Sequence, residues 1–378
     1  MVDIQFVKAS DYCESVVDGT HDSPKPCDEG FYLITSKHLL DYEINFASAY
    51  KISEADYNLI TKRSSVKQWD ILLSMIGTVG RVYIERNSNS EYACKNVGIF
   101  KCGGDRYKAL WLYYVLKSPY CKQYISKVLA GSTQSYISLG NLRAFPVPVI
   151  ADEKRNRIIE ALSTLDDKIE VNNKIIQNID EFCRTCFNKA FSHLAKLKEL
   201  KDICSIVMGQ SPEGSSLNSK KQGTVFYQGC ADFGKHYPNR RLYTTNPKRL
   251  AKKGDILLSV RAPVGRVNIA NEDCCIGRGL ATLKSSTPFF TLFSLYASRG
   301  EFATFDAEGT VFGSINKKSL EEIKIFNADD CAIEKFEKFS APFMKKIFTL
   351  DLENRLLTNM RNALLPKLLS GEIELKNQ

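Results

Sequence analysis

Basic side chains gather in stretches of the sequence that hold almost no acids. Lys235–Lys253 contains seven Lys or Arg residues and no Asp or Glu, and Lys101–Arg143 contains seven against the single acid Asp105. Cys274–Gly300 adds three basic residues and no acid, whereas Asp152–Glu170 carries six acids. Positive charge concentrated in some segments and diluted in others is typical of a polyanion-binding protein, although the solvated face of an ordinary protein can look the same.

The sequence shows no recognisable catalytic motif. Its four histidines stand in no known catalytic pattern, and there is no GxSxG, HExxH or GxxxxGK[ST] run. Asn246-Pro247 is followed by Lys248, without the second proline that amino-methyltransferases use to hold a flipped base. Scattered acids and lysines leave a metal-dependent nuclease core open as an alternative. We expect a protein that binds its target and is not itself an enzyme, with no metal or cofactor of its own.

Twelve cysteines raise the question of disulfides or zinc. They are scattered, and the chain starts without the basic-then-apolar pattern of a secretion signal, so we expect reduced thiols. Cys183 and Cys186 form a lone CxxC inside a helical pattern, which favours small buried side chains over a zinc site. No apolar run reaches the ~18 residues of a membrane helix. We therefore expect a cytoplasmic protein without a membrane partner.

An internal duplication organises the chain. Asp70–Ile84 (DILLSMIGTVGRVYI) and Asp255–Ile269 (DILLSVRAPVGRVNI) are identical at ten of fifteen positions, at an offset of 185 residues. Gly131–Leu142 and Gly309–Leu320 share their first, seventh and last residues at an offset of 178. The DILLS and VGRV runs predict two strands joined by a turn in each copy. The apolar runs Trp111–Val115 and Phe289–Leu295 predict a buried helix in each copy.

Each copy is followed by a long helical pattern. In the first, apolar residues step by four and three over about four heptads, with Asn172 as the polar interruption, which indicates a coiled coil. Its positions are Ile158, Leu162, Leu165, Ile169, Asn172, Ile176, Ile179, Cys183 and Cys186. The second pattern is less regular, and we expect Pro366 to end it. It runs through Phe336, Phe339, Phe343, Ile347, Leu350, Leu357, Met360 and Leu364.

These patterns predict an α+β fold with two similar mixed α/β domains. Two long antiparallel helices would separate the domains as a coiled-coil spacer with pseudo-twofold symmetry, because the chain must return through a whole domain between them. The expected segments are a first domain at 1–150, a first spacer helix at 151–195, a second domain at 196–328, and a second spacer helix with the C-terminal tail at 329–378.

Several motifs resemble the specificity subunit of type I restriction-modification systems. Asp18-Gly19-Thr20-His21, followed by Pro24, is similar to the DGTHxTP stretch that opens many target-recognition domains of that family. Ile52-Ser53 through Tyr57 and then the DILLS run follow in the family's order, and Gly209-Gln210-Ser211-Pro212 resembles the opening of a second such domain. The tail Leu364–Ile373 is similar to the family's C-terminal end. The resemblance spans essentially the whole chain.

The resemblance implies a non-catalytic subunit that recognises a two-part asymmetric site in double-stranded DNA. It further implies that two methyltransferase subunits bind along the helices and that restriction subunits join the full complex. S-adenosylmethionine, magnesium and ATP would then bind only to partner subunits. The alternative from another class is a protein-interaction scaffold, with duplicated domains on a coiled-coil rod.

Candidate DNA contacts lie in the acid-free stretches and in the loops that differ between the copies. Arg and Lys suit guanine edges and phosphates, and Asn and Gln suit adenine. Arg81 and Arg266 occupy the same repeat position, which favours a phosphate contact or a structural ion pair, whereas Arg261 faces Ile76 in the other copy and is the better base-contact candidate. His21 could instead cap a turn beside Asp18. The candidates are His21, Arg81, Thr133, Gln134, Tyr136, Arg240, Arg241, Arg261, Arg266, Arg278, Phe312, Asn316 and Lys317.

Overall fold

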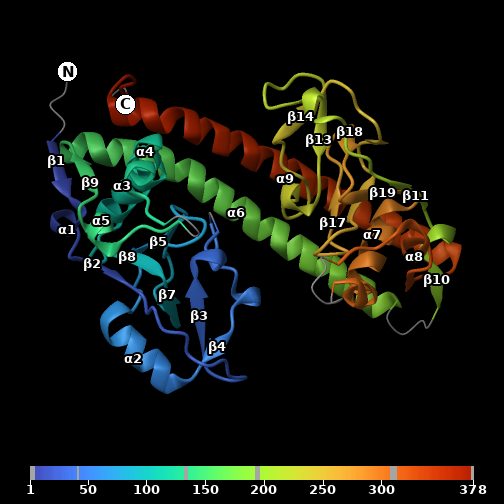
Figure 1. Cartoon of the computed structure of the whole chain (residues 1–378), viewed down its shortest axis with the longest axis horizontal. Coiled ribbons are helices and arrows are strands. Elements are labelled where there is room, and N and C mark those ends of the chain that lie inside the picture. The colour runs from blue at the N-terminus through green and yellow to red at the C-terminus, as the bar shows by residue number, and fades with distance from the viewer. Residues whose placement is uncertain (1–4, 41, 132–134, 192–195, 307–312, 376–378) are drawn as a thin grey trace. The chain divides into compact units, whose positions relative to one another are not determined.

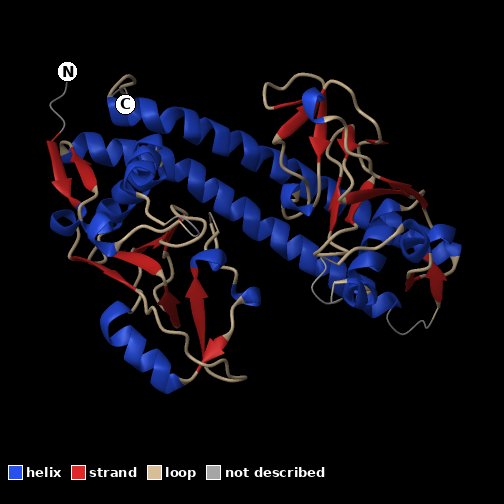
Figure 2. Cartoon of the chain, in the orientation of Figure 1, coloured by secondary structure: helices blue, strands red, loops and turns tan. Residues whose placement is uncertain are grey.

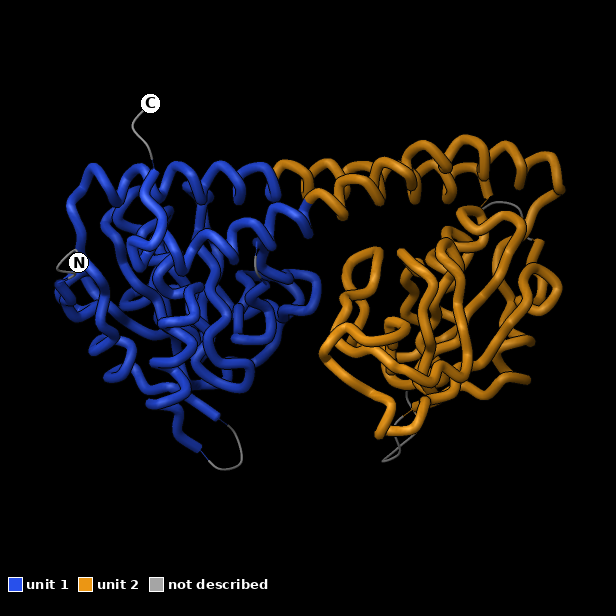
Figure 3. The backbone as a smooth tube through the Cα atoms, turned by 90° about the horizontal axis from the view of Figure 1, so that it is seen from above, with its two compact units in different colours: residues 1–170, 354–378 blue, residues 171–353 orange. Residues whose placement is uncertain are grey.

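The chain divides into two compact units that each mix helices with β-sheets (Figures 2 and 3). Residues 1–170 and 354–378 form the first unit, and residues 171–353 form the second. Each unit contains one domain and part of both long helices. The computed structural model (Figure 1) describes residues 5–40, 42–131, 135–191, 196–306 and 313–375.

Two helices of 40 and 41 residues contribute to both units: α6 (Asp152–Phe191) and α9 (Asp330–Ser370). In the first unit, Arg361 of α9 donates a hydrogen bond to Asp166 of α6 at 2.7 Å. In the second unit, the side-chain amide of Asn172 on α6 donates to Glu353 of α9 at 2.8 Å. Later positions on α6 thus meet earlier positions on α9, which confirms the two long antiparallel helices.

The seam predicted on α6 is buried or partly buried at every position. Asn172 is fully buried within it, and its amide reaches across to α9. Leu165, Ile179 and Cys186 are partly buried. The positions that are at most 4 % exposed are Ile158, Leu162, Ile169, Ile176 and Cys183.

The seam predicted on α9 is wrong at two positions. Phe339 is 38 % exposed and Met360 is 52 % exposed. The buried stripe runs instead through the polar residues Ser340 and Arg361, which are 0 % and 4 % exposed. A search for apolar spacing does not count polar residues. The prediction therefore chose Phe339 instead of Ser340 and Met360 instead of Arg361, one position away in each case.

The predicted end of this helix at Pro366 is also wrong, because α9 continues to Ser370. A proline inside a helix removes one backbone hydrogen bond and costs about 3 kcal/mol. Leu365 and Leu368 on either side of it are both 2 % exposed in the core of the first unit. Their burial offsets that cost and holds the last turn.

The first domain contains a four-stranded antiparallel sheet of order β2-β8-β5-β6 and a three-stranded sheet of order β4-β3-β7. A third pair, β1 with β9, joins the two ends of the domain. The strands are β1 (Gln5–Lys8), β2 (Ser15–Asp18), β3 (Phe31–Thr35), β4 (Lys51–Ile52), β5 (Ile71–Ser74), β6 (Val82–Ile84), β7 (Tyr92–Lys95), β8 (Val97–Lys101) and β9 (Pro146–Val149). The helices are α1 (Ala9–Tyr12), α2 (Glu54–Ser64), α3 (Arg106–Lys117), α4 (Pro119–Val128) and α5 (Leu139–Arg143).

The second domain repeats the four-stranded sheet and the closing strand pair, and its other sheet has five strands instead of three. Its four-stranded sheet has the order β11-β19-β16-β17, its other sheet β12-β14-β13-β18-β15, and β10 pairs with β20. The strands are β10 (Leu197–Glu199), β11 (Ser205–Met208), β12 (Leu217–Asn218), β13 (Thr224–Tyr227), β14 (Leu242–Thr244), β15 (Leu250–Ala251), β16 (Ile256–Ser259), β17 (Val267–Ile269), β18 (Cys274–Ile276), β19 (Leu280–Lys284) and β20 (Lys324–Phe326). The helices are α7 (Pro288–Ala297) and α8 (Lys317–Glu321).

The duplicated motif forms the same hairpin in both domains, as predicted. In the first, the Ser74 hydroxyl donates to the Thr78 carbonyl at 2.5 Å and accepts from the backbone N–H of Arg81 at 2.8 Å. In the second, Ser259 makes the same two bonds at 2.6 and 2.9 Å, the latter with Arg266. The serine of the DILLS run therefore closes the turn, which explains why both copies keep it.

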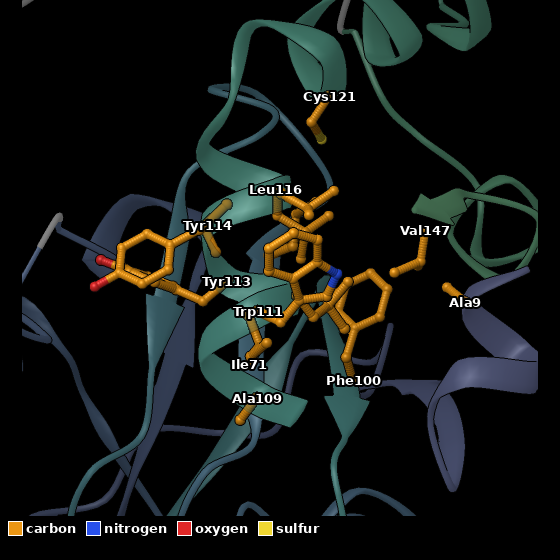
Figure 4. Close-up of a cluster of buried hydrophobic side chains, with 14 of the residues drawn as sticks. Ala9, Ile71, Phe100, Ala109, Trp111, Tyr113, Tyr114, Leu116, Cys121 and Val147 are labelled. Atoms are coloured by element: carbon orange, nitrogen blue, oxygen red, sulfur yellow. The ribbon is translucent and has the colours of Figure 1, made fainter. Parts of the chain in front are cut away.

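The predicted buried helices are also present, as α3 and α7. Figure 4 shows Trp111 of α3 packed among side chains that include Phe100 and Leu116. Its indole N–H donates to the Pro148 carbonyl at 2.7 Å, so the one polar atom of this buried ring is satisfied. This core supports β5 and β8, the central strands of the four-stranded sheet.

A buried histidine ties the stability of the second unit to pH. His236 is 4 % exposed, and neither ring nitrogen has a hydrogen-bond partner within the described residues. Burial lowers its pKa from 6.5 to about 4; Asp180 opposes this shift, and Lys235 and Arg184 add to it. The ring is therefore neutral in the folded unit at neutral pH.

We expect the second unit to lose about 3 kcal/mol of folding free energy as the pH falls from 6.5 to 4, because only the unfolded chain takes up this proton in that range. Urea unfolding at a series of pH values measures the loss. His236→Leu removes the titrating group and should flatten the curve. Parallel curves for the two proteins between pH 6.5 and 4 would contradict the assignment.

Candidate nucleic-acid interface

Three segments meet at one end of the four-stranded sheet in the first domain. Beyond β5, Ile137 N donates to Met75 O at 2.9 Å and Gly77 N donates to Ser135 O at 3.1 Å. These bonds place Tyr136 opposite Ile76. On the other side, Met75 N donates to the carbonyl oxygen of Asn96, next to Lys95, at 3.3 Å. The loop that contains Tyr136 is thereby fixed to the sheet at its base.

The second domain builds the same end with the same bonds. Ile315 N donates to Val260 O at 3.0 Å, and Ala262 N donates to the Gly313 carbonyl at 2.9 Å. Arg261 therefore lies opposite Ser314, as Ile76 lies opposite Tyr136. Val260 N donates to Gly279 O at 3.0 Å, next to Arg278. We call these two regions the interface ends. The first interface end comprises residues 75–77, 95–96 and 135–137, and the second comprises residues 260–262, 277–279 and 313–316.

The two interface ends carry different side chains on this common frame. The first presents Tyr136, Ile76 and Lys95, and the second presents Ser314, Arg261 and Arg278. Tyr136, Arg261 and Arg278 are exposed. Thr133, Gln134 and Phe312, which the sequence also suggested, lie outside the described residues.

Arg81 and Arg266 lie in the duplicated hairpin and are both exposed. The Arg81 guanidinium donates to the Leu39 carbonyl at 3.2 Å, which gives it a structural contact. The side chain of Arg266 has no acidic partner within the described residues. Each arginine can still direct N–H donors to a phosphate from its surface position.

Other predicted contacts are engaged with acids. Arg240 pairs with Glu272 at 2.5 Å, and this bond raises the pKa of the guanidinium. Arg241 pairs at 2.6 Å with Asp232, a buried carboxylate that also accepts from the backbone of the loop. Both arginines remain more than half exposed. Their first role is to hold their loops, and a DNA contact would have to share these donors.

The remaining candidates have local structural roles. His21 lies between Asp18, 3.0 Å from Nε2, and Asn96, 2.8 Å from Nδ1, as the turn-capping alternative anticipated. The Asn316 side chain accepts from the N–H of Ser319 at 2.9 Å and caps α8. Lys317 approaches Glu321 on the same helix at 3.4 Å. None of these contacts excludes DNA, and all three residues are exposed.

Sequence reasoning missed Lys95 and Gln228. Lys95 donates to the Ser23 hydroxyl and occupies the ladder position that Arg278 occupies in the second domain. Gln228 is exposed and accepts at 3.2 Å from Ser211, whose oxygen accepts from the backbone of Arg278 at 3.2 Å. No sequence pattern singled out Lys95, because its place beside the hairpin depends on the β5–β8 register.

The chemistry available at the interface ends is hydrogen bonding and charge attraction. Within the described ranges, no three His, Cys, Asp or Glu side chains group as a metal ion requires. All twelve cysteines are free thiols. No helix in the described parts of the chain is long and apolar enough to cross a membrane.

Two mixed domains that share a four-stranded sheet and a hairpin, with different side chains at equivalent ends, define a duplicated recognition protein. Residues 1–181 and 195–326 match the family described as the type I restriction modification DNA specificity domain. The putative type I restriction enzyme MjaX specificity subunit of Methanocaldococcus jannaschii is 33 % identical over 286 residues, which cover 68 % of this chain and 67 % of the relative. The MjaIX specificity subunit of the same organism is 21 % identical over 390 residues, covering 91 % and 87 %.

A solved structure shares the fold. The crystal structure of the type I restriction-modification system S subunit from M. genitalium matches with a TM-score of 0.54 at 15 % identity, covering 100 % of this chain and 98 % of that one. The chain belongs to the family of type I restriction-modification specificity subunits, whose domain recognises DNA. The family works with methyltransferase and restriction subunits.

Proposed function

We propose that the two domains read two different half-sites of one double-stranded DNA sequence, each through its interface end. The observation that carries this proposal is the pair of equivalent hydrogen-bonded frames with unlike side chains on them. A common frame presents its residues to DNA in the same way. Different residues at equivalent places then select different bases, so the site is asymmetric and in two parts.

In this proposal, one set of residues provides affinity for DNA and another set provides sequence specificity. The arginines of the hairpin, Arg81 and Arg266, are common to both domains and suit the phosphates that every DNA sequence offers. Tyr136 and Arg261 differ from their counterparts and suit base edges. Arg240 and Arg241 would contact the second half-site only by sharing their donors with Glu272 and Asp232.

The helices serve methyltransferase docking. In the second unit, α6 exposes Val171, Ile175 and Phe182 at intervals of four and seven residues, with exposed fractions of 51 %, 36 % and 48 %. Leu352 on α9 is 48 % exposed in the same unit, and Leu356 is 56 % exposed in the first. Exposed apolar side chains at helical spacing suit a partner protein.

We further propose the full assembly implied by the family. Two methyltransferase subunits bind along the helices, and restriction subunits join for cleavage. This chain supplies no catalytic group, and S-adenosylmethionine, magnesium and ATP bind to the partner subunits. The complex acts in the cytoplasm, where the DNA is.

A salt titration tests DNA binding directly. The full chain, with and without methyltransferase subunits, is titrated against mixed-sequence duplex DNA from 50 to 300 mM salt. We expect the logarithm of affinity to fall by about 0.9 per phosphate contact for each decade of salt. Arg266→Ala should lower the slope by about 0.9. Binding without a salt dependence would favour the protein-interaction scaffold instead.

A further inference from the structure

The first strand of the first domain, β1, pairs with a single neighbour among the described strands. That neighbour is β9 (Figure 1), and directly after β1 the N–H of Ala9 donates to Phe145 O at 2.8 Å. In an antiparallel ladder the N–H and C=O of one residue point to the same side, and the side alternates along the strand. Because Ala9 faces β9, Phe6 and Lys8 face the opposite way. Among the described residues, no backbone group outside the strand pair bonds to the N–H of either.

The second domain begins with the same arrangement. Its first strand, β10, pairs with β20, and the N–H of Leu200 donates to Ile323 O at 2.9 Å. Leu200 thus corresponds to Ala9 and faces β20. The residues that face the opposite way are Leu197 and Glu199, and within the described ranges their N–H groups also have no backbone partner.

The domain itself closes the other side of each strand pair. In the first domain, the indole of Trp111 on α3 donates to Pro148 O of β9 at 2.7 Å. In the second, the N–H of Phe326 on β20 donates to the hydroxyl of Ser298, which follows α7, at 3.3 Å. The outer edges of β1 and β10 are therefore the sides at which a further strand can add to these pairs.

The two outer edges share one side-chain property and differ in another. Phe6 and Leu197 occupy equivalent positions and are 54 % and 52 % exposed. Lys8 and Glu199 are also equivalent, but their charges are opposite. The common features are thus an exposed apolar side chain and the outward backbone groups beside it.

A ligand that both domains share has to recognise these common features. DNA does not fit, because its phosphates attract cations and Glu199 would repel them. An extended protein segment fits, since strand addition at an open edge uses backbone hydrogen bonds together with side-chain contacts. In addition, β9 leads into α6 and β20 leads into α9, the helices that the proposed function assigns to methyltransferase docking.

Resting on the proposed function, we infer that each edge strand accepts an extended segment of one methyltransferase subunit as an added β-strand. The segment exchanges two hydrogen bonds with the N–H and C=O of Phe6 in the first domain, or of Leu197 in the second. It accepts a third from the N–H of Lys8 or Glu199, and it packs an apolar side chain on the exposed apolar residue. Two copies of one partner thereby bind two domains whose interface ends differ.

Proline in place of Lys8 or Glu199 tests the added strand. Both residues have a φ of −67°, the value that proline imposes, and the N–H that proline removes faces outward, so both variants should fold. Isothermal titration calorimetry measures binding of the methyltransferase subunit to the full chain. The wild-type protein should bind two subunits. Lys8→Pro should weaken one of them by about 5- to 10-fold, and Glu199→Pro the other, because the added strand loses a hydrogen bond and meets the proline ring.

Glu213→Pro is the matched control, because its φ is −63° and it lies outside both edge strands. It should leave both affinities unchanged. Phe6→Ser keeps every backbone group and tests the apolar contact, with an expected loss of about 5- to 30-fold at the first site. Thermal unfolding shows whether each variant folds, and Phe6→Ser decides the outcome if a proline variant does not.

Wild-type affinity in the folded proline variants, or in Phe6→Ser, would overturn the inference and leave docking along the helices intact. A wild-type chain that binds no methyltransferase subunit would overturn the proposed docking and the inference together. Self-association of the chain that Lys8→Pro abolishes would assign the edge to a second copy, which also overturns the inference.

Discussion

Asp166→Ala should lower the folding free energy of the first unit by about 3 to 5 kcal/mol, because it leaves a buried guanidinium without its counter-charge. Asp166 is fully buried on α6, and Arg361 on α9 is 4 % exposed. Arg361 donates to Asp166 at 2.7 Å, and Tyr42 donates to the same oxygen at 2.9 Å. Arg361 also donates to the Tyr42 hydroxyl. One carboxylate thus connects both helices with the first domain.

The double variant Asp166→Leu, Arg361→Met separates the charge penalty from simple loss of packing. Removing both charges leaves no orphaned ion, so the double variant should recover most of the loss, since apolar replacements of buried pairs are often neutral or stabilising. Denaturant unfolding of the three proteins provides the comparison. A single-variant loss below about 1 kcal/mol, or a double variant no better than the single, would show that the pair does not hold this unit together.

Phe336→Ala should destabilise the second unit by about 3 to 5 kcal/mol. Its ring, on α9, is 6 % exposed and lies 5.2 Å from Phe187 of α6 and 5.6 Å from Phe293 of α7, measured between centroids. Phe191 lies 5.7 Å away. Truncation leaves a cavity among rings from three helices, which cannot all shift to fill it.

Phe339 is the matched control for this truncation. It lies three residues along the same helix, contacts Phe336 at 6.0 Å and is 38 % exposed. Phe339→Ala should therefore cost about 1 kcal/mol, because its site is open to water. Urea titration measures both variants, and equal losses would show that the aromatic cluster is not the core of this unit.

The parts of the fold that repeat were predictable from the sequence. Identity at ten of fifteen positions between 70–84 and 255–269 meant that one hairpin had to form twice, and it does. The steps of three and four residues after Glu153 predicted α6 because a buried stripe on a helix must follow its turn. The proposed segment boundaries remain predictions.

The polar contacts between distant segments could not be predicted. Asp166 and Arg361 are separated by 195 residues, and each alone resembles a surface charge in the sequence. Arg240 was a DNA candidate because its neighbours are basic, whereas its carboxylate partner, Glu272, lies 32 residues away in the sequence. The number of charges in a sequence segment does not show which of them form ion pairs, because ion pairing depends on the tertiary structure.

The candidate interface was predicted in part. The hairpin and the loop after Ala130 were known to differ between the copies, and the structure brings them together at Ile76 and Tyr136. The third segment, with Lys95, carries no sequence signal of its own because its place depends on the β5–β8 register. Whether these residues touch DNA is still a prediction.

Mapping methylated adenines across the genome, in cells with and without this gene, tests the central claim most directly. We predict one asymmetric two-part motif, with a fixed gap, that is methylated only when the gene is present. Exchange of Arg261 for isoleucine should alter one half of that motif and leave the gap and the other half as they were. Methylation that does not depend on the gene, or a single uninterrupted palindrome, would contradict a pair of unlike domains that read separate half-sites.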